Sequence, residues 1–255
     1  MLQTQIVNRI GIISLNRPEK RNAFNAELVK LINDAVISFN TNNDIRAILI
    51  NANGEAFSAG ADLAYLKQLR NNTLEENKQD SLALAKMFAN IYNSPKLTFS
   101  AVQGFALAGG CGLATVTDFC LASTSAKFGY TEVKIGFIPA IVLTYLTRRI
   151  SGTALNKLLL TGEIIEADVA LKMGLISDIL LDNNFHETVL ERIQKVIRTT
   201  SPNSIAKTKE LMRRVVTLDV TEAMELASIY NAESRASEDC ITGVDAFLNK
   251  QKITW

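Results

Sequence analysis

Two segments of the chain are rich in small residues and lie after a predicted strand and before a predicted helix. They are residues 54–66, GEAFSAGADLAYL, and residues 103–118, QGFALAGGCGLATVTD. Small side chains let another molecule lie against the main chain, and the first N–H groups of a helix have no acceptor within it. One N–H group from each segment could therefore converge on a single oxygen atom, which is the arrangement of an oxyanion hole. The chemistry indicated is stabilisation of negative charge as it develops on a carbonyl oxygen.

The sequence offers little for other reaction classes. His186 is the single histidine and no G-x-S-x-G motif accompanies it, so we expect a structural or surface role rather than a Ser-His-Asp mechanism. Cys111, Cys120 and Cys240 form no C-x-x-C pair, which argues against a disulfide framework and a zinc site, and no metal is predicted. No G-x-G-x-x-G motif follows the first strand directly, and no G-K-[ST] loop is present. Carboxylates, backbone N–H groups and hydroxyls remain.

The composition is that of a globular protein with a full core, since 47% of the 255 residues are hydrophobic and 21% are charged. A net charge of +1 gives no overall field that would recruit nucleic acid or an anionic membrane, so we expect neither partner. No uncharged apolar stretch reaches the ~18 residues of a membrane span, and the first residues do not resemble a secretion signal. These features favour a cytoplasmic location.

Strand-like and helix-like patterns alternate in the first half of the chain. Strands are predicted at 11–16, 45–52, 96–104 and 118–123, and Asn25 is predicted to cap the helix that follows it. This alternation with apolar strands indicates an α/β layer architecture.

Helices dominate from about residue 141 onward. One of them is expected to end at Gly152 as a C-cap, and three further helices are expected over 202–217, 219–236 and 238–250.

Five motifs occur in order along nearly the whole chain: LNRPEKRNAFN, AFSAGADL, SAVQGFALAGGCGLATVTDFCLAS, AKFGYTEVKIGFIP and SEDCITGVDAFLNKQK. In these the chain resembles the crotonase, or enoyl-CoA hydratase/isomerase, superfamily. The resemblance implies an α/β fold with a spiral core of ββα turns, here residues 1–197. It also implies a C-terminal helical trimerisation region, residues 198–255, and trimers that commonly stack as hexamers. No cofactor is implied, because the coenzyme A thioester is the substrate.

The resemblance also assigns roles to individual residues. The backbone N–H groups of Ala61 and Gly109 would hold the thioester oxygen, and Glu132 would act as the general acid–base group. Positions that match coenzyme A-binding segments are Lys20, Arg21, Ala23, Ser58, Ala59, Asp62 and Leu63, with Phe247 and Lys250 reaching the coenzyme A of a neighbouring subunit.

Two departures from the family pattern stand out. Hydratases of the family typically carry a second glutamate, which would fall at position 112, where this chain has Gly112. The glycine-rich P-G-x-G-G pattern is replaced by IPAIVLTYL at residues 138–146. In both respects the chain looks more like the methylglutaconyl-CoA hydratase branch of leucine breakdown. Asp118, Thr117 and Tyr130 are polar residues near the motifs that could supply a second group.

The predicted activity is that of a lyase, the reversible hydration of a 2-enoyl-CoA in fatty acid metabolism or leucine degradation, with 3-methylglutaconyl-CoA as a candidate substrate. A Δ3,Δ2-enoyl-CoA isomerase is the alternative, because moving a proton from C2 to C4 needs only one base. Decarboxylation of a glutaconyl-type thioester would use the same enolate. A catalytically silent coenzyme A binder is a hypothesis from another class.

Overall fold

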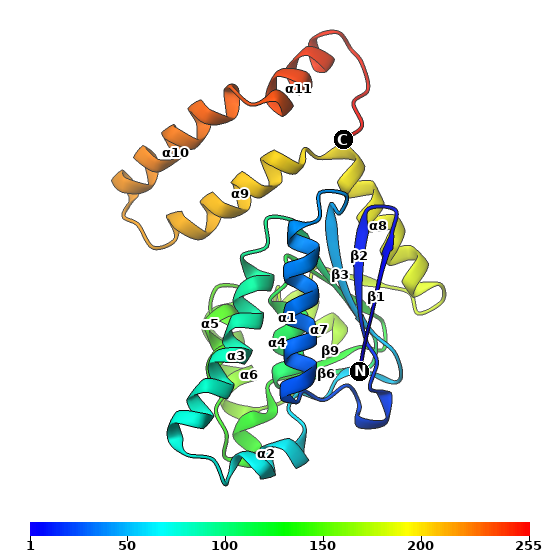
Figure 1. Ribbon diagram of the computed structural model, residues 1–255, viewed down its shortest axis with the longest axis vertical. Helices are drawn as coiled ribbons and strands as arrows, with labels where there is room; N and C mark the ends of the chain where they lie inside the picture. Colours follow the sequence, from blue (N-terminus) through cyan, green and yellow to red (C-terminus); the bar gives the residue numbers. More distant parts are fainter.

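The apolar runs of the first half of the chain form a six-stranded sheet at the centre of the molecule (Figure 1). The computed structural model describes residues 1–255, and the strand order in this sheet is β1-β2-β3-β5-β7-β10. All neighbours are parallel except β1 and β2, which form an antiparallel pair. The strands are β1 (Leu2–Val7), β2 (Ile10–Leu15), β3 (Ala47–Ala52), β5 (Leu97–Val102), β7 (Phe119–Ser123) and β10 (Asp178–Leu180).

A second, four-stranded sheet has the order β4-β6-β8-β9. Its strands are β4 (Ala56–Ser58), β6 (Phe105–Leu107), β8 (Lys127–Gly129) and β9 (Ile164–Glu166), and only β9 runs antiparallel to its neighbour. Each of β4, β6 and β8 directly follows a strand of the larger sheet along the chain, and a helix follows each pair. These repeated ββα units confirm the predicted spiral core.

Helices cover both faces of the larger sheet. On one face, α8 (Phe185–Thr199) buries Phe185, Val189, Ile193 and Ile197 against the strands. The other face belongs to a core cluster of 36 buried residues shared with the remaining helices of the body and the second sheet. Those helices are α1 (Ala26–Thr41), α2 (Leu63–Leu69), α3 (Leu74–Tyr92), α4 (Gly109–Thr115), α5 (Ala140–Leu146), α6 (Gly152–Thr161) and α7 (Ala167–Lys172), with 3₁₀ turns η1 (Pro18–Lys20) and η2 (Thr131–Ile135).

The local signals for helix ends were correct at one place and wrong at another. Asn25 caps α1 as predicted, because its side chain accepts the N–H of Leu28 at 2.9 Å. The prediction that Gly152 ends a helix is wrong: α5 ends at Leu146, and Gly152 is the first residue of α6. The turn between these helices places Arg149, which donates to the carbonyl oxygens of Thr115, the last residue of α4, and of Thr117 just after it.

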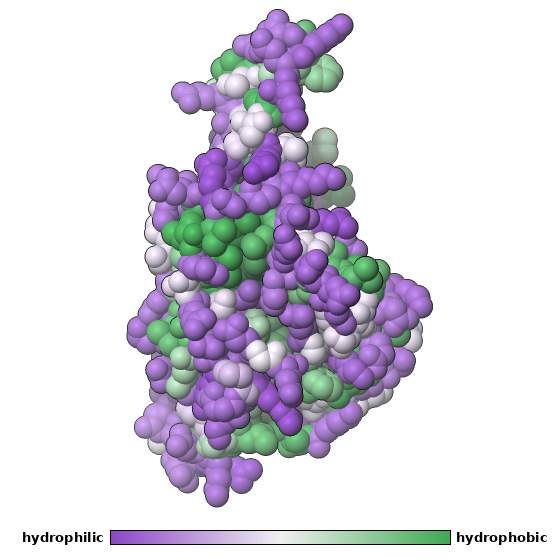
Figure 2. All heavy atoms as spheres, turned by 90° about the vertical axis from the view of Figure 1, so that its right-hand side faces the viewer, coloured by the Kyte–Doolittle hydropathy of each residue, from purple (hydrophilic) through white to green (hydrophobic).

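The three predicted C-terminal helices are α9 (Pro202–Val215), α10 (Val220–Arg235) and α11 (Glu238–Leu248). We call them the C-terminal arm, because they project from one end of the body (Figures 1 and 2). Apolar side chains on the arm are largely exposed, for example Val220, Met224, Phe247 and Leu248. None of the helices combines the length and the apolar character needed to span a membrane.

A buried ion pair joins the arm to the body. Lys209 of α9 is buried and contacts the carboxylate of Asp118, at the start of β7, and the carbonyl oxygen of Lys96. Asp118 also accepts the N–H and the hydroxyl of Thr98, at 2.7 and 3.0 Å. The carboxylate and the ammonium group therefore satisfy one another where α9 meets the larger sheet.

Replacing Lys209 by methionine keeps most of the side-chain volume but leaves Asp118 without its counter-charge. We expect the free energy of unfolding to fall by about 3 kcal/mol, as measured by urea denaturation, because a partly buried charge then lacks its partner. Lys207→Met, on the same helix at an exposed site paired with glutamates, is the control and should change it by less than about 0.5 kcal/mol. Equal effects of the two substitutions would contradict an anchoring role for Lys209.

Candidate active site

Three chain segments meet at one edge of the smaller sheet. The parallel strands β4, β6 and β8 are neighbours, and residues 59–61, 108–109 and 130–132 follow directly after them. Because the carboxyl ends of parallel strands lie at the same edge, where ligands of α/β proteins bind, this edge gathers Ala61, Gly109 and Glu132 from distant parts of the sequence. The predicted convergence of the two small-residue segments is therefore present in the fold.

The first segment is held in place by backbone pairing with Phe24. The N–H of Phe24 donates to the Gly60 carbonyl at 2.7 Å, and the N–H of Asp62 donates to the Phe24 carbonyl at 2.9 Å. Gly60 has a φ of +86°, and a Cβ atom there would lie 2.7 Å from Cβ of Ala108 and 3.4 Å from the nitrogen of Gly109. Only glycine fits this close approach. The next residue, Ala61, is exposed, and its N–H has no acceptor in the protein.

The second segment turns sharply into α4. Ala108 has φ +50° and ψ −127°, a conformation that costs a residue with a Cβ about 1–3 kcal/mol. Its own N–H donates to the carbonyl of Gly129 at 2.7 Å, which fixes the turn to the end of β8. Gly109 is then the first residue of α4, so its N–H lacks an acceptor within the helix. The two unpaired N–H groups, of Ala61 and Gly109, come from segments in direct contact.

Glu132 lies on the third segment. It is only 7% exposed, and its Oε2 atom is buried without a hydrogen-bond partner. Burial raises the pKa of the Glu132 carboxyl above its ordinary value, because the charged form loses hydration that the hydrogen bond from its own backbone N–H offsets only in part. A carboxylate with a raised pKa is a stronger base than a solvated one, as general acid–base catalysis near neutral pH requires.

A hydrocarbon side chain fills the place beside Gly112. A Cβ atom on Gly112 would lie 2.1 Å from Cγ1 of Val142 and 3.2 Å from Cε1 of Phe88. Val142 stands where the family pattern P-G-x-G-G has a glycine, so the two departures seen in the sequence are one change of packing. The volume that a side chain at 112 would use belongs to a side chain at 142 instead, and position 112 offers no second carboxylate.

The polar residues considered as a second group are engaged elsewhere. Asp118 pairs with Lys209, and the hydroxyl of Thr117 donates to the Ala114 carbonyl at 3.0 Å. The hydroxyl of Tyr130 lies 2.8 Å from that of Thr115. The protein contains no group of three or more His, Cys, Asp or Glu side chains that could hold a metal ion.

The predicted coenzyme A-binding residues of the body lie beside Ala61. The Ser58 hydroxyl donates to the Asn22 carbonyl, and the Ala59 N–H donates to the Arg21 carbonyl, both at 2.9 Å. The loop that contains Lys20, Arg21 and Ala23 therefore packs on the segment after β4, with Lys20 and Arg21 exposed and Ala23 buried.

Asp62 and Leu63 continue this segment into α2. Asp62 caps the helix and forms an ion pair with Arg17 at 2.7 Å. These interactions within the chain account for the burial of Asp62. Leu63 is exposed, at 72%. Phe247 lies on α11 of the arm, which projects from the body (Figure 1), and Lys250 follows that helix; both are exposed.

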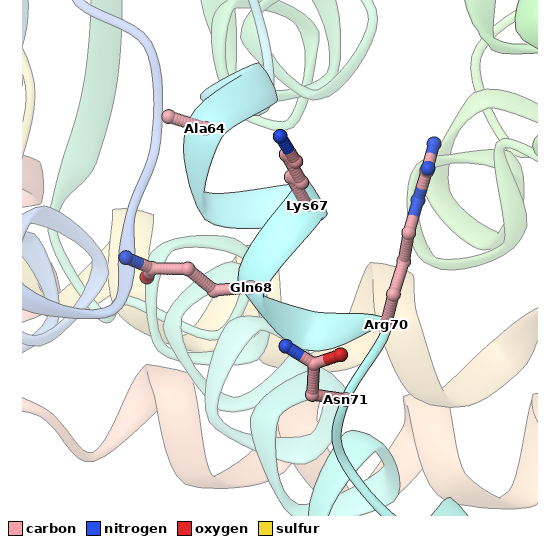
Figure 3. Close-up of a pocket in the computed structure, with 5 residues that line it drawn as sticks. All are labelled: Ala64, Lys67, Gln68, Arg70 and Asn71. Carbon is pink, nitrogen blue, oxygen red and sulfur yellow. The ribbon is translucent and has the colours of Figure 1, made fainter.

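Sequence reasoning did not single out a basic cleft on α2. The cleft, about 430 Å³ in volume, is lined by Ala64, Lys67, Gln68, Arg70 and Asn71. Lys67 and Arg70 extend in the same direction from the helix (Figure 3). Their spacing of three on a predicted helix was the available signal, because residues three apart lie on neighbouring positions of one face.

The packing of Gly112 against Val142 can be tested by exchanging their volumes. Gly112→Ala alone should lower the free energy of unfolding by about 2 kcal/mol, since the new methyl group collides with Val142. Combined with Val142→Gly, the loss should be smaller than the sum of the single losses, because each change makes room for the other. Urea denaturation measures both. Gly243→Ala, whose methyl group would lie 3.5 Å from Trp255, is a control expected to be neutral or stabilising; an equally harmless Gly112→Ala would contradict the packing.

Comparison with known proteins agrees with the fold and the motifs. The family model described as enoyl-CoA hydratase/isomerase matches residues 5–255. A Thermus thermophilus protein is 36% identical over 242 residues, which are 95% of each chain. A short-chain-enoyl-CoA hydratase of Clostridium acetobutylicum is 30% identical over 96% of this chain and 93% of its own.

Solved structures agree as well. The crystal structure of an enoyl-CoA hydratase from Shewanella pealeana superposes with a TM-score of 0.93 at 29% identity, over 100% of this chain and 95% of the other. The resemblance inferred from the five motifs is thus confirmed by sequence and by fold. The chain belongs to the enoyl-CoA hydratase/isomerase family and is an enzyme of the crotonase superfamily.

Proposed function

We propose that the protein reversibly adds water to a 2-enoyl-CoA, with Glu132 as its single general acid–base group. The observation that carries the proposal is a buried carboxylate with an unpaired oxygen, on the same sheet edge as two unpaired backbone N–H groups. The carboxylate is a base, and the two N–H groups are donors for a carbonyl oxygen. A thioester bound to both can form an enolate.

The reaction follows from these roles. The N–H groups of Ala61 and Gly109 hold the thioester oxygen and stabilise its negative charge as the oxygen of water bonds to C3. Glu132 takes a proton from that water and delivers a proton to C2 as the carbonyl re-forms. Every atom of one water molecule is added to the double bond, and the carboxylate is regenerated.

The carrier half of the substrate would lie along the loop that contains Lys20 and Arg21 and along α2. Support comes from the contact of this loop with the segment of Ala61 and from the basic cleft of Lys67 and Arg70. Cationic side chains of this kind suit the phosphates of coenzyme A. For the acyl half we propose a branched or carboxylated enoyl group of the 3-methylglutaconyl type, on the motif resemblance alone.

Isomerisation of a 3-enoyl-CoA to a 2-enoyl-CoA is the second candidate. It is favoured by the packing of Val142 against Gly112, because the reaction requires one base and no group to activate water. Decarboxylation of a glutaconyl-type thioester makes still smaller demands on a second acid.

We further propose that the chain assembles as a homotrimer or as a hexamer of two stacked trimers. Support comes from the exposed apolar residues of the arm, since monomers rarely leave so many such side chains in water. Light scattering should therefore give a mass of three or six chains of 28.0 kDa. A mass of one chain at micromolar concentration would overturn this proposal.

Product analysis in D₂O separates the candidate reactions. The protein should convert a 2-enoyl-CoA, or 3-methylglutaconyl-CoA, into the 3-hydroxy thioester with one deuterium at C2, as seen by mass spectrometry. Conversion of a 3-enoyl-CoA without addition of water would identify an isomerase instead. Loss of carbon dioxide would identify a decarboxylase, and binding without conversion would identify a silent binder.

In the same assay, Glu132→Gln should lower turnover by about 10²- to 10⁴-fold and leave thioester binding near that of the wild type. The Gln variant should also melt at a higher temperature above pH 5, and the difference should vanish at lower pH. The reason is that a raised folded-state pKa makes ionisation of Glu132 destabilising as pH rises. Glu166→Gln, an exposed carboxylate on β9, is the matched control and should change neither quantity by much. Unchanged turnover in Glu132→Gln would overturn the single-base mechanism.

A further inference from the structure

The hydroxyl of Tyr130 is a buried polar group that the proposed reaction does not use. Tyr130 is fully buried, and its oxygen lies 2.8 Å from the Oγ1 atom of Thr115. Thr115 Oγ1 also donates to the carbonyl of Cys111 at 2.9 Å, and either hydroxyl can be the donor in the bond between Tyr130 and Thr115. Burial raises the pKa of Tyr130 well above its ordinary value, which keeps the hydroxyl neutral and able to donate.

This bond joins the two segments that carry the proposed chemistry. Thr115 is the last residue of α4, and Gly109 is the first. Tyr130 precedes η2, in which Glu132 is the second residue. A side-chain hydrogen bond therefore links the helix that begins with a thioester-binding N–H to the turn that carries the base.

A second tether lies at the other end of α4. The N–H of Ala108 donates to the carbonyl of Gly129 at 2.7 Å, immediately before Tyr130. The helix is thus tied at both ends to the same short stretch of chain, by a main-chain bond at its start and a side-chain bond at its end. Ser100 and Arg149 also donate to carbonyl oxygens at the end of α4, but neither residue belongs to η2.

We propose that Tyr130 is a positioning residue, which holds α4 against η2 so that the Gly109 N–H and the Glu132 carboxylate face one acyl group. The inference rests on the proposed function, because it concerns the distance between those two groups. Small displacements of reacting groups cost large factors in rate, whereas binding of the long coenzyme A part is spread over other residues. The expected signature is therefore a fall in kcat without a rise in KM.

The test compares Tyr130→Phe with a control that loses a different hydrogen bond to α4. Ser100→Ala removes a buried hydroxyl of β5 that donates to the Ala114 carbonyl of α4 at 2.6 Å, so it breaks a bond to α4 without touching η2. Both variants should lose a similar amount of thermal stability. Tyr130→Phe should lower kcat about tenfold with KM within twofold of the wild type, and Ser100→Ala should keep kcat within twofold.

A double-mutant cycle identifies the bond itself. Thr115→Val should lower kcat like Tyr130→Phe, and the double variant should be no slower than the slower single variant, because both changes remove one interaction. A wild-type kcat in Tyr130→Phe, an equal loss in Ser100→Ala, or multiplied losses in the double variant would each overturn the inference. These outcomes leave wild-type turnover intact, so they differ from failure of the proposed function, in which the wild type converts no enoyl-CoA and this inference falls with it.

Discussion

The parallel alignment of β4, β6 and β8 is the constraint on which the rest of the site depends. Each strand has only three residues, yet each ends at the same edge and delivers one part of the site. The larger sheet sets their order, because each short strand continues from a long one. A slip of one residue in either register would turn Ala61 or Gly109 away from its neighbour. The long apolar strands of the larger sheet thus affect the site indirectly, because they fix where β4, β6 and β8 start.

The same edge contains a carboxylate that is poorly solvated, that of Glu132. Glu132 is desolvated and has an oxygen without a donor, so its charged form is unfavourable in the fold. The fold tolerates this carboxylate because the stability supplied by the surrounding core exceeds the free-energy cost of burying the charge. Val142 places hydrocarbon, rather than a second polar side chain, beside Gly112 of α4. The basicity of the carboxylate and its poor solvation are one property.

Much of this arrangement could be predicted from the sequence, because the signals are local. Apolar runs gave the strands, Asn25 gave the start of α1, and small residues around Gly60 and Gly109 indicated where a backbone must lie bare. The individual roles of Ala61, Gly109 and Glu132 came from motif resemblance and stay predictions.

What could not be predicted depends on contacts between distant residues. The meaning of Gly112 is visible only when Val142, on another helix, is seen to occupy its space. The ion pair of Lys209 with Asp118 likewise joins residues that no periodic pattern relates. Gly152 misled because a glycine after a helical pattern can serve as a C-cap or as the start of the next helix, and here α5 has already ended at Leu146.

The unusual backbone of Ala108 has a consequence for the preorganisation of the turn before α4. The conformation is held by the hydrogen bond from the Ala108 N–H to the Gly129 carbonyl, and it fixes the direction of the Gly109 N–H within the fold itself. The energetic cost of the backbone conformation at Ala108 is offset when the chain folds, by the interactions of the surrounding structure. The turn before α4 is therefore preorganised, because the backbone strain at Ala108 is part of the folded structure.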